Sequence, residues 1–457
     1  MDLEYFNLVL SKKSLHNWLS EYIFNRLGVQ NNIKFDNNEF TILFYDHSKK
    51  FIINFKPNGR FFLFDNKKNK YFVINKRSQF LFDYSNQLPK NGLVCYGISN
   101  IDWFLEEIDK NYISLNYDFL SYAIWTLNRI EEIDFSFTEK HNRFQVSNSH
   151  LKVDLLFLRP IVDEWFLFIS NILQNNGFFT KNHCFSFSIS HDIDIVSRYK
   201  EVPILHKILK MCKDLIFNYK TLFTYIKNPN KFVQQEHSNN LEYLMHLSDS
   251  INTKSKFYFI VGNSSFRYDY RYKLSSFFIL SLIKKIIIKG HEVGIHYSYN
   301  SSLKRLINKE WLYFFKLCKD LGYKIKGGRM HYLRINFLDT LSQLADAGQN
   351  YDNTLTFHEF GGFRCGTCFP FKPYNFITQK KINIEVRPLI LMDDSLLNYM
   401  NTTDDENAFI YVKNLIDSCQ FVNGTFSILW HNSNLDNKFK LELYKRILMY
   451  LSYISKK

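Results

Sequence analysis

The stretch Phe187-Ser-Ile-Ser-His-Asp-Ile-Asp-Ile195 ends an apolar, strand-like run in an imidazole and two carboxylates, which belong to His191, Asp192 and Asp194. Two like charges removed from water repel each other unless a cation or a proton lies between them. An Asp after a strand can simply cap the next helix, but one cap uses only one carboxylate. This strand end is therefore the first candidate for chemistry, because α/β proteins place their sites at such ends.

The chain around this stretch alternates between strand-like and helix-like segments from residue 181 onward. This alternation predicts an α/β fold with a parallel sheet, open or closed into a barrel. Apolar periodicity predicts helices over 274–288, from Ser302 toward Leu321, and over 337–347, where Gly348 provides the stop. The expected strands are 185–190, 256–261, 292–295, 325–328, 350–354, 384–388 and 425–430.

Residues 1–180 have a different pattern, and no catalytic constellation stands out among them. Short runs rich in Phe, Ile and Tyr are separated by Lys, Asn and Gly clusters, which is typical of antiparallel strands joined by turns. We therefore expect an α+β accessory domain over 1–180, without an assigned role, and the barrel domain over 181–457. The expected strands are 40–44, 51–55, 60–64 and 71–74, and the expected helices are 119–133 and 154–173.

The composition is that of a folded protein with a basic surface. Of 457 residues, 46% are hydrophobic and 18% aromatic, which argues against disorder. The net charge of +14 suits anionic glycans, lipid phosphates or nucleic acid, but it also follows from lysine spread over the whole surface. We favour the second explanation, because no dense basic block with interleaved aromatic residues occurs. Nucleic acid is therefore not an expected partner.

Neither a signal peptide nor a membrane span is evident. Met1 to Ser14 lacks the basic start, apolar core and small-residue cleavage site of an export signal, and 274–288 is too short and too charged to cross a bilayer. We expect a cytoplasmic protein, with peripheral contact at the inner membrane face left open. Seven cysteines without an export signal predict reduced thiols, and we interpret Cys365-Gly-Thr-Cys368 as incidental thiols rather than a redox pair.

Polar residues recur where other predicted strands end. His296 follows Gly294-Ile295, Arg329 follows Gly327-Gly328, Asp352 opens Asp-Asn-Thr, and His431 follows Ile428-Leu-Trp. In a barrel the carboxyl ends of the strands converge on one mouth. Convergent Asp and His side chains with a nearby Arg fit a metal that activates water, a carboxylate base and an imidazole acid.

The order of these motifs resembles the NodB-homology polysaccharide deacetylases, carbohydrate esterase family four, over about residues 184–435. The similarity is strongest to a subgroup with a separate N-terminal domain. It implies a distorted (β/α) barrel and a metal-dependent hydrolase that removes an N-acetyl group from a sugar of a surface polysaccharide or its cytoplasmic precursor. The segments that carry the resemblance are 191–194, 290–299, 329–334, 351–354, 362–367 and 429–433.

The resemblance also implies a metal set. Asp194 matches the metal-binding carboxylate, although Ile193 separates it from Asp192 where the family usually has adjacent Asp residues. His296 matches the first metal-binding His. The second His of the family falls on Asn300, so the third ligand is either the Asn300 carbonyl oxygen or His331, and we prefer His331 because imidazole is the better zinc ligand. The expected ion is a divalent metal, zinc in the first place, with cobalt, nickel or manganese as alternatives.

The catalytic roles come from the same resemblance. Asp192 matches the general base, Arg329 the residue that holds that base, and His431 the acid that protonates the leaving amine. Asp352 matches the region that orients and tunes His431. His191 is expected to hydrogen-bond across the strand ends instead.

Residues of nearby polar loops are predicted to contact substrate: Tyr268, Asp269, Arg364 and Trp430. Arg364 follows Gly361-Gly362 and could bind a carboxylate or phosphate, or be an ordinary loop Arg in solvent. For the pair Asp393 and Asp394, a ligand role and helix capping are both open.

The expected partner is an N-acetylated saccharide or a lipid-linked or nucleotide-linked glycan precursor. The missing His at position 300 leaves a second hypothesis, a catalytically inactive glycan-binding or scaffolding protein in polysaccharide assembly. A third and weaker hypothesis is binding of the basic surface to nucleic acid or to an anionic membrane.

Overall fold

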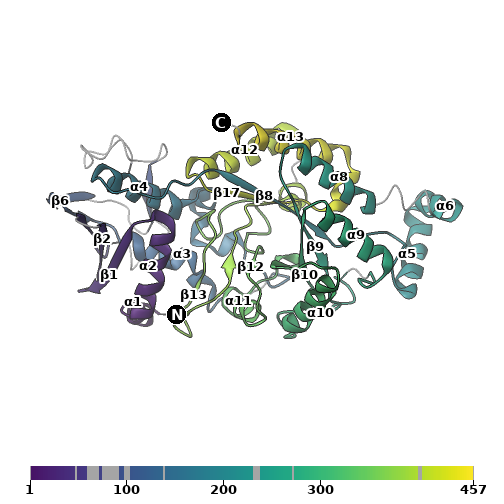
Figure 1. Cartoon of the computed structure of the whole chain (residues 1–457), viewed down its shortest axis with the longest axis horizontal. Coiled ribbons are helices and arrows are strands. Elements are labelled where there is room, and N and C mark those ends of the chain that lie inside the picture. The colour runs from purple at the N-terminus through teal and green to yellow at the C-terminus, as the bar shows by residue number, and fades with distance from the viewer. Residues whose placement is uncertain are drawn as a thin grey trace.

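The molecule is elongated in this computed structural model, with three parts along its length (Figure 1). An N-terminal sheet lies at one end, a barrel-like sheet in the middle, and the helices α5 (Ile204–Phe217) and α6 (Tyr219–Lys227) at the other end. The structure describes residues 2–46, 49–58, 71–74, 92–96, 103–136, 139–229, 237–269, 272–399 and 404–455.

The N-terminal sheet has the strand order β1-β2-β3-β7-β6 and is antiparallel except where β3 pairs with β7. Alternate residues of β2, Phe40, Ile42 and Phe44, are fully buried, because every second side chain of a strand faces the same side. The bounds are β1 Gln30–Asp36, β2 Glu39–Asp46, β3 Lys49–Phe55, β6 Leu105–Asp109 and β7 Tyr112–Leu115, with a separate antiparallel pair β4 Tyr71–Ile74 and β5 Leu93–Tyr96.

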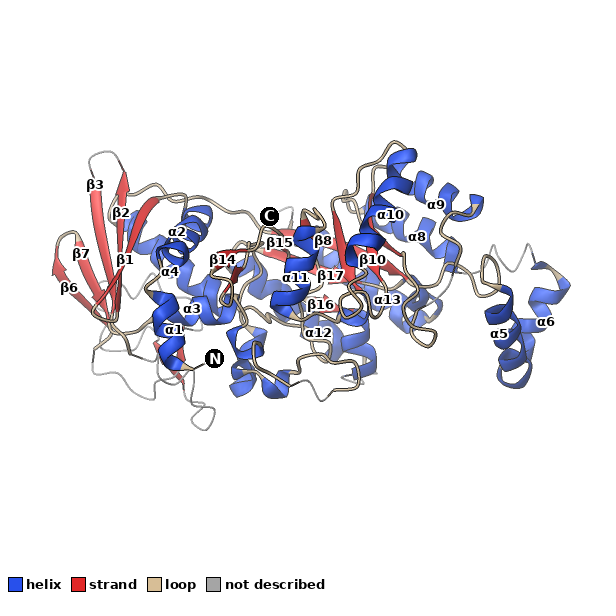
Figure 2. Ribbon diagram, turned by 90° about the horizontal axis from the view of Figure 1, so that it is seen from below, coloured by secondary structure: helices blue, strands red, loops and turns tan. Residues whose placement is uncertain are grey.

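Four helices lie between this sheet and the barrel (Figure 2). They pack through aromatic side chains: Trp165 of the last helix stacks on Phe119 of the third, with ring centroids 4.7 Å apart. The bounds are α1 Leu3–Leu10, α2 Lys13–Leu27, α3 Phe119–Leu127 and α4 Ile161–Asn175. The N-terminal region is therefore α+β, as the sequence predicts.

Local chemistry explains where the N-terminal elements differ from expectation. The helix expected over 119–133 ends at Leu127, and Arg129 takes a left-handed backbone with φ 49°. The helix expected over 154–173 begins only after Pro160, a residue tolerated at a helix start but not inside. The expected strands 40–44, 51–55 and 71–74 fall in β2, β3 and β4, whereas 60–64 lies outside the described residues.

The central sheet confirms the (β/α) barrel. Eight described strands, all parallel, have the order β15-β12-β11-β10-β9-β8-β17-β16. Gly328 permits close approach of β11 to β10, because a Cβ there would overlap the carbonyl oxygen of Ile295. The bounds are β8 Ser186–Ile193, β9 Lys256–Ile260, β10 Glu292–Tyr297, β11 Gly327–Met330, β12 Tyr351–Asp352, β15 Glu385–Val386, β16 Leu391–Met392 and β17 Thr425–Leu429.

The two edge strands β15 and β16 are consecutive in the chain, and the residues between them close the sheet. The N–H of Leu389 donates to the Leu355 carbonyl on one side, and the N–H of Ile390 donates to the Ser427 carbonyl on the other, both at 3.0 Å. Segment 385–392 therefore bridges both edges of the sheet.

Further helices surround the barrel, several with side-chain caps at their first turn. Ser276 accepts a hydrogen bond from the N–H of Ile279, and Asn336 accepts one from the N–H of Asp339. The bounds are α8 His237–Ser250, α9 Phe277–Ile288, α10 Ile307–Asp320, α11 Phe337–Asp346, α12 Asp405–Phe421 and α13 Lys438–Ile454, with a short antiparallel pair β13 Tyr374–Asn375 and β14 Lys380–Lys381.

The N-terminal region and the barrel share one buried apolar core and buried ion pairs. The guanidinium of Arg364, in the barrel, donates to both carboxylate oxygens of Glu132 at 3.0 and 2.6 Å. Both side chains are about 2% exposed. The buried core is thus continuous between residues 1–180 and 181–457, and the domain boundary expected near residue 181 stays a prediction.

Two further expectations concern the membrane and the cysteines. Within the described residues, no helix combines the length and the apolar character needed to cross a bilayer. All seven cysteines are free, and Cys365 and Cys368 are 1% exposed each.

Candidate active site

A cavity of about 230 Å³ opens at the carboxyl ends of the barrel strands. Leu333, Met392 and Leu429 give it an apolar wall, and Arg143 reaches it from the N-terminal region. Its carboxylate and imidazole lining residues are Asp192, Asp194, His296, His331, Asp394 and His431. The strand-end residues Asp192, Asp194, His296 and His431, predicted to converge, thus border one small space.

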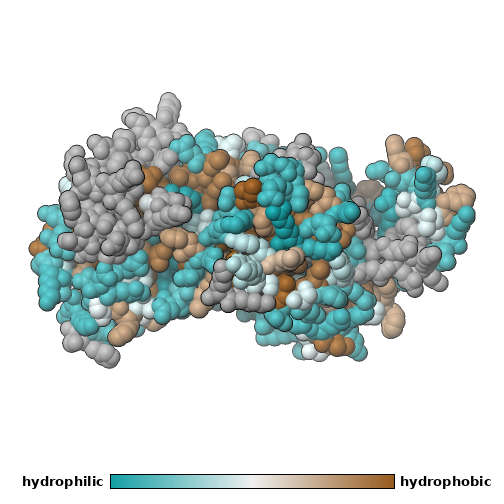
Figure 3. Space-filling model, turned by 90° about the horizontal axis from the view of Figure 1, so that it is seen from above, coloured by the Kyte–Doolittle hydropathy of each residue, from teal (hydrophilic) through white to brown (hydrophobic). Residues whose placement is uncertain are grey.

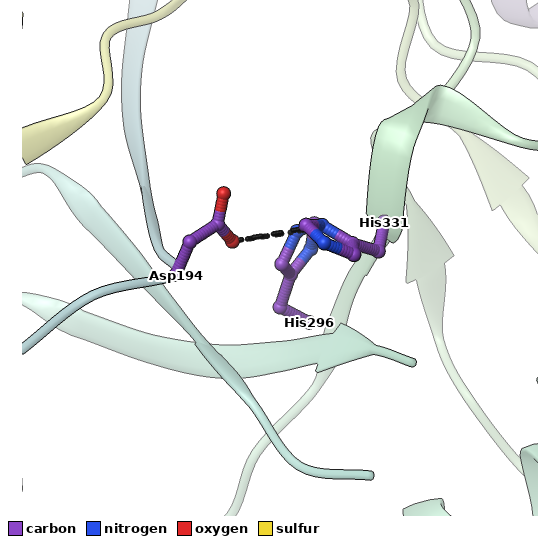
Figure 4. Close-up of side chains that lie close together, drawn as sticks. All are labelled: Asp194, His296 and His331. Carbon is purple, nitrogen blue, oxygen red and sulfur yellow. Dashed lines mark hydrogen bonds and ion pairs between the residues drawn. The ribbon is translucent and has the colours of Figure 1, made fainter. Parts of the chain in front are cut away.

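Two imidazoles and a carboxylate gather on one side of this cavity (Figure 4). His296 Nε2 lies 2.9 Å from His331 Nδ1 and 3.3 Å from Asp194 Oδ1. The third side of this triangle, from His331 Nδ1 to Asp194 Oδ1, measures 3.6 Å. His296 comes from β10, whereas Asp194 and His331 directly follow the ends of β8 and β11.

Backbone carbonyls fix which ring nitrogens carry hydrogen in the neutral imidazoles. His296 Nδ1 lies 3.1 Å from the Arg329 carbonyl oxygen, and His331 Nε2 lies 3.0 Å from the Tyr268 carbonyl oxygen. A carbonyl oxygen only accepts, so each of these nitrogens is the donor. The two nitrogens that face each other, His296 Nε2 and His331 Nδ1, therefore both present lone pairs, and a cation or proton is needed between them.

The three ligand atoms fit a divalent cation. Metal–ligand bonds of about 2.0–2.2 Å imply tetrahedral edges of roughly 3.3–3.6 Å, which match the separations of both imidazoles from Asp194 Oδ1, whereas the two imidazole nitrogens lie closer together, at 2.9 Å. Asp194 Oδ1 is buried and has no hydrogen-bond partner, so it has an unused acceptor. Burial raises the pKa of Asp194, but His331, His296 and His431 outweigh burial and hold that pKa well below its usual value. The carboxylate is thus ionised and able to bind a metal.

Asp192 is held beside this cluster by Arg329. The guanidinium donates from Nη1 to Asp192 Oδ1 at 2.7 Å, from Nη2 to the Ser190 hydroxyl at 2.8 Å and from Nε to the Asn353 carbonyl at 2.8 Å. Three fixed acceptors give the guanidinium one orientation. The other carboxylate oxygen of Asp192, Oδ2, lies 3.7 Å from His296 Nε2 and faces the cluster.

His431 also lines the cavity and pairs with Asp393. The two side chains meet because β16 and β17 are paired in register, Leu391 with Ile428 and Met392 with Leu429, so both residues follow adjoining strand ends. Burial lowers the pKa of His431, but the carboxylates of Asp393, Asp394 and Asp194 outweigh it and hold that pKa well above its usual value. The imidazole is thus a cation whose Nε2 lies 3.9 Å from Asp194 Oδ2.

Two of the residues named from the sequence lie elsewhere. The side chain of Asn300 accepts from Arg334 at 3.0 Å and is not part of the His296 cluster, which takes His331 instead. Asp352 accepts from the N–H and hydroxyl of its neighbour Thr354, so the partner of His431 is Asp393 rather than Asp352.

The residues predicted to contact substrate fall into two groups, one at the cavity and one in the interior. Tyr268 lines the cavity, and its contact with substrate stays a prediction, whereas the other three side chains are buried in the interior. Asp269 accepts from the N–H groups of Ser264, Ser265 and Tyr299, Arg364 is paired with Glu132, and Trp430 is fully buried against Tyr444. Each of these three is therefore corrected to a structural role. His191 bonds the Trp430 carbonyl across the strand ends, as expected.

Residues of the cavity that the sequence did not reveal include Arg143 and Tyr332. Arg143 pairs with Glu139 at 2.9 Å and donates to the Tyr332 carbonyl at 3.3 Å. It comes from a region whose sequence shows no catalytic pattern, so only the tertiary structure brings it to the cavity.

Comparison with known proteins yields one family and several distant structures. Residues 9–178 match a family of unknown function, DUF7033. Among curated proteins, no sequence matches this chain. A candidate polysaccharide deacetylase from Mycobacterium smegmatis is similar at a TM-score of 0.39 and 12% identity, over 60% of this chain and 85% of that one.

Two further structures are similar at the same level. One is the Puue allantoinase, at a TM-score of 0.39 and 13% identity, over 59% of this chain and 84% of that one. The other is described as a polysaccharide deacetylase of Pseudomonas aeruginosa PAO1, at a TM-score of 0.38 and 13% identity, over 59% of this chain and 85% of that one.

Proposed function

We propose that this protein is a metal-dependent hydrolase that removes an N-acetyl group from a sugar. The observation that carries the proposal is the convergence of the His296 and His331 lone pairs on the Asp194 carboxylate, 2.9 to 3.6 Å apart, at the edge of a cavity. Amide hydrolysis needs a base and an acid on either side of the reacting carbon, and Asp192 and His431 border that cavity. The motif order of the sequence supports the same assignment.

Asp194, His296 and His331 would hold the ion, which supplies Lewis-acid polarisation of the amide carbonyl and of water. Two imidazoles and one carboxylate are a donor set that suits zinc, and cobalt, nickel or manganese also accept it. The backbone carbonyls that hold the outer nitrogens of His296 and His331 orient both rings toward the ion.

Asp192 would act as the general base. Arg329 occupies its Oδ1, which leaves Oδ2 directed toward the His296 cluster and able to accept a proton from a water molecule in the cavity. The same hydrogen bonds prevent rotation of the carboxylate, so Oδ2 keeps this direction.

His431 would act as the general acid. Asp393 accepts from Nδ1 at 2.7 Å, which leaves the N–H at Nε2 directed into the cavity. The leaving nitrogen of the substrate would receive this proton as the C–N bond breaks. Asp393 also accepts the backbone N–H of His431 at 2.7 Å, so the imidazole and its partner are held as one unit.

The cavity suits a single sugar ring better than a long glycan segment. Its volume of about 230 Å³ lies below the roughly 300–1,000 Å³ of pockets for drug-sized ligands. Tyr268 and Tyr332 line it with their rings 5.5 Å apart and inclined at 67°, and either ring can offer its face to a sugar. We therefore propose an N-acetylated sugar at the end of a glycan or of a lipid-linked or nucleotide-linked precursor.

The test is acetate release by the purified full chain from N-acetylglucosamine oligomers and from a nucleotide-linked N-acetyl sugar, with metal content measured in parallel. Activity should disappear with a chelator, return with zinc, and be lost in Asp192→Asn. Asp346→Asn, on the exposed end of α11, is the matched control and should keep full activity. Activity that survives both the chelator and Asp192→Asn would contradict the proposal. Saccharide binding without acetate release would favour the glycan-binding alternative.

A further inference from the structure

The helical hairpin α5–α6 exposes an unusual amount of apolar surface. It projects from the barrel at the far end of the molecule, joined at Asn218 (Figures 1 and 2). Apolar surface is visible on this projecting end in the space-filling view (Figure 3). The exposed large hydrophobic residues on the hairpin are Ile204, Leu205, Ile208, Leu209, Leu215, Ile216, Phe217, Tyr219, Phe223 and Ile226, each 50% to 78% exposed.

These residues form continuous faces rather than scattered positions. On α5, Ile204, Ile208 and Cys212 follow at intervals of four, and Leu205, Leu209 and Ile216 lie next to them on the same side of the helix. On α6, Tyr219, Phe223 and Ile226 share one face in the same way. Monomeric soluble proteins rarely leave contiguous apolar faces in water, so this surface needs a partner.

The charges on the hairpin identify the partner as anionic. Segment 203–229 contains five lysines: Lys207, Lys210, Lys213, Lys220 and Lys227. Its single acidic residue, Asp214, is 1% exposed, and both its carboxylate oxygens accept from Arg198, one of them also from Tyr199. The surface that the hairpin presents is therefore apolar and positively charged, without an exposed carboxylate.

We propose that the α5–α6 hairpin lies in the interface of an anionic lipid membrane, with its apolar faces in the headgroup region. An amphipathic helix with basic residues beside its apolar face binds membranes in this way. Helices of 14 and 9 residues measure roughly 21 and 14 Å, too short to cross a bilayer, so they lie on it. A second copy of the chain is a poorer partner, because two hairpins would bring ten lysines together.

The hairpin is connected to the candidate site. It begins ten residues after Asp194, and His206 of α5 packs on Phe266, with ring centroids 4.6 Å apart. Phe266 belongs to the loop that carries Tyr268, a residue of the cavity wall. Membrane binding would thus hold the cavity near the lipid surface. The use of this position for a lipid-linked substrate rests on the proposed function, whereas membrane binding itself does not.

The test is flotation of the full chain with vesicles of phosphatidylcholine, with and without phosphatidylglycerol. We expect binding to the anionic vesicles that falls at least about tenfold in Ile208→Glu/Ile216→Glu and roughly fivefold for each of Lys213→Gln and Lys220→Gln. Met449→Glu is the matched control, because Met449 and Ile216 are both 72% exposed, and it should bind as the wild type does. Circular dichroism of each variant checks that the fold is kept.

A second measurement tests whether the hairpin itself enters the lipid surface. Cys184 and Cys212 are the exposed cysteines among the seven, so a Cys184→Ser protein can carry an environment-sensitive fluorophore on Cys212 alone. Anionic vesicles should shift its emission to shorter wavelength. No flotation and no shift would overturn the proposal, as would a hairpin-dependent dimer in sedimentation without vesicle binding. Because neither readout uses catalysis, failure of the deacetylase proposal would leave this result unchanged.

Discussion

His431 Nδ1 lies 2.7 Å from Asp393 Oδ1, and the same carboxylate accepts the backbone N–H of His431 through Oδ2, also at 2.7 Å. Asp393 is fully buried, so its charge acts on the imidazole through a medium of low polarity. Asn434 donates to Asp393 as well, at 2.7 Å, and thereby fixes the carboxylate. The buried Asp393 carboxylate therefore stabilises the protonated form of His431, which is the form that the proposed reaction needs.

Asp393→Asn should therefore weaken the acid. Removing the carboxylate lowers the pKa of His431, so the imidazole loses its proton at lower pH and the alkaline limb of the pH–rate profile moves toward acid. We expect kcat to fall about 10²-fold or more, within the range of general acid catalysis. Asp394→Asn, which removes a carboxylate not bonded to the ring, should shift the limb less. A profile unchanged in Asp393→Asn would contradict the role of His431.

Arg329→Met should be strongly destabilising. The change leaves Asp192 buried without its cation and removes the donors to Ser190 and Asn353, which costs about 3–5 kcal/mol of unfolding free energy. Arg329→Lys keeps the charge but not the three donors, so its loss should be smaller. Urea denaturation measures the unfolding free energy of both variants. An Arg329→Met protein as stable as the wild type would show that the ion pair does not stabilise the fold.

The choice between His331 and Asn300 as third metal ligand can be decided by metal content. His331→Ala should lower the number of bound metal ions per chain, whereas Asn300→Ala should leave it unchanged, because the Asn300 side chain bonds Arg334 instead. Elemental analysis after dialysis against buffered zinc gives the number. Equal loss in both variants would place Asn300 in the site.

The Glu132–Arg364 pair should behave as a coupled unit between the N-terminal region and the barrel. Glu132→Leu leaves the buried guanidinium of Arg364 without its carboxylate and should cost about 3–5 kcal/mol. Arg364→Leu should cost less, because Arg129 still pairs with Glu132 at 2.6 Å. The double variant should cost less than the sum of the two, since neither charge remains. A double-mutant cycle from urea midpoints measures the difference, and simple additivity would count against direct coupling.

Asp352 should make stability fall as pH rises. Burial raises its pKa from 3.8 to about 6 against the two hydrogen bonds from Thr354. Between these values the folded chain holds a proton that the unfolded chain has lost, so this contribution is present below about pH 4 and lost through pH 6. The difference in unfolding free energy between wild type and Asp352→Asn should change by roughly 2 kcal/mol from pH 4 to pH 7. A constant difference would show that Asp352 titrates normally.

The barrel and much of the candidate site follow from local patterns. Asp192, Asp194, His296, Arg329 and His431 each end or follow an apolar strand, and parallel strands carry such residues to one edge. The signal is strong because these strands are buried on both faces and therefore form short continuous apolar runs. It needs no knowledge of which distant segments meet.

Long-range pairing explains what the sequence could not provide. The strand before Asp393 has only two residues, Leu391 and Met392, too few for a periodic signal, so Asp393 was equally consistent with a helix cap. Arg364 follows a Gly-rich loop that suggests solvent, yet its partner Glu132 is 232 residues away. Local sequence patterns do not indicate contacts between residues so far apart in the chain. The position of Arg143 at the cavity has the same origin, because it comes from the N-terminal region.

The closing segment of the barrel has a consequence for how activity arises during folding. Its last strand, β16, pairs with β17 and delivers Asp393 to His431 one residue later. Until residues 385–392 have joined both edges of the sheet, the Asp393 carboxylate is not beside the imidazole of His431. Chains in which this segment is not yet in place should therefore lack the fixed His431–Asp393 pair of the proposed reaction even when β8 and β17 are already paired.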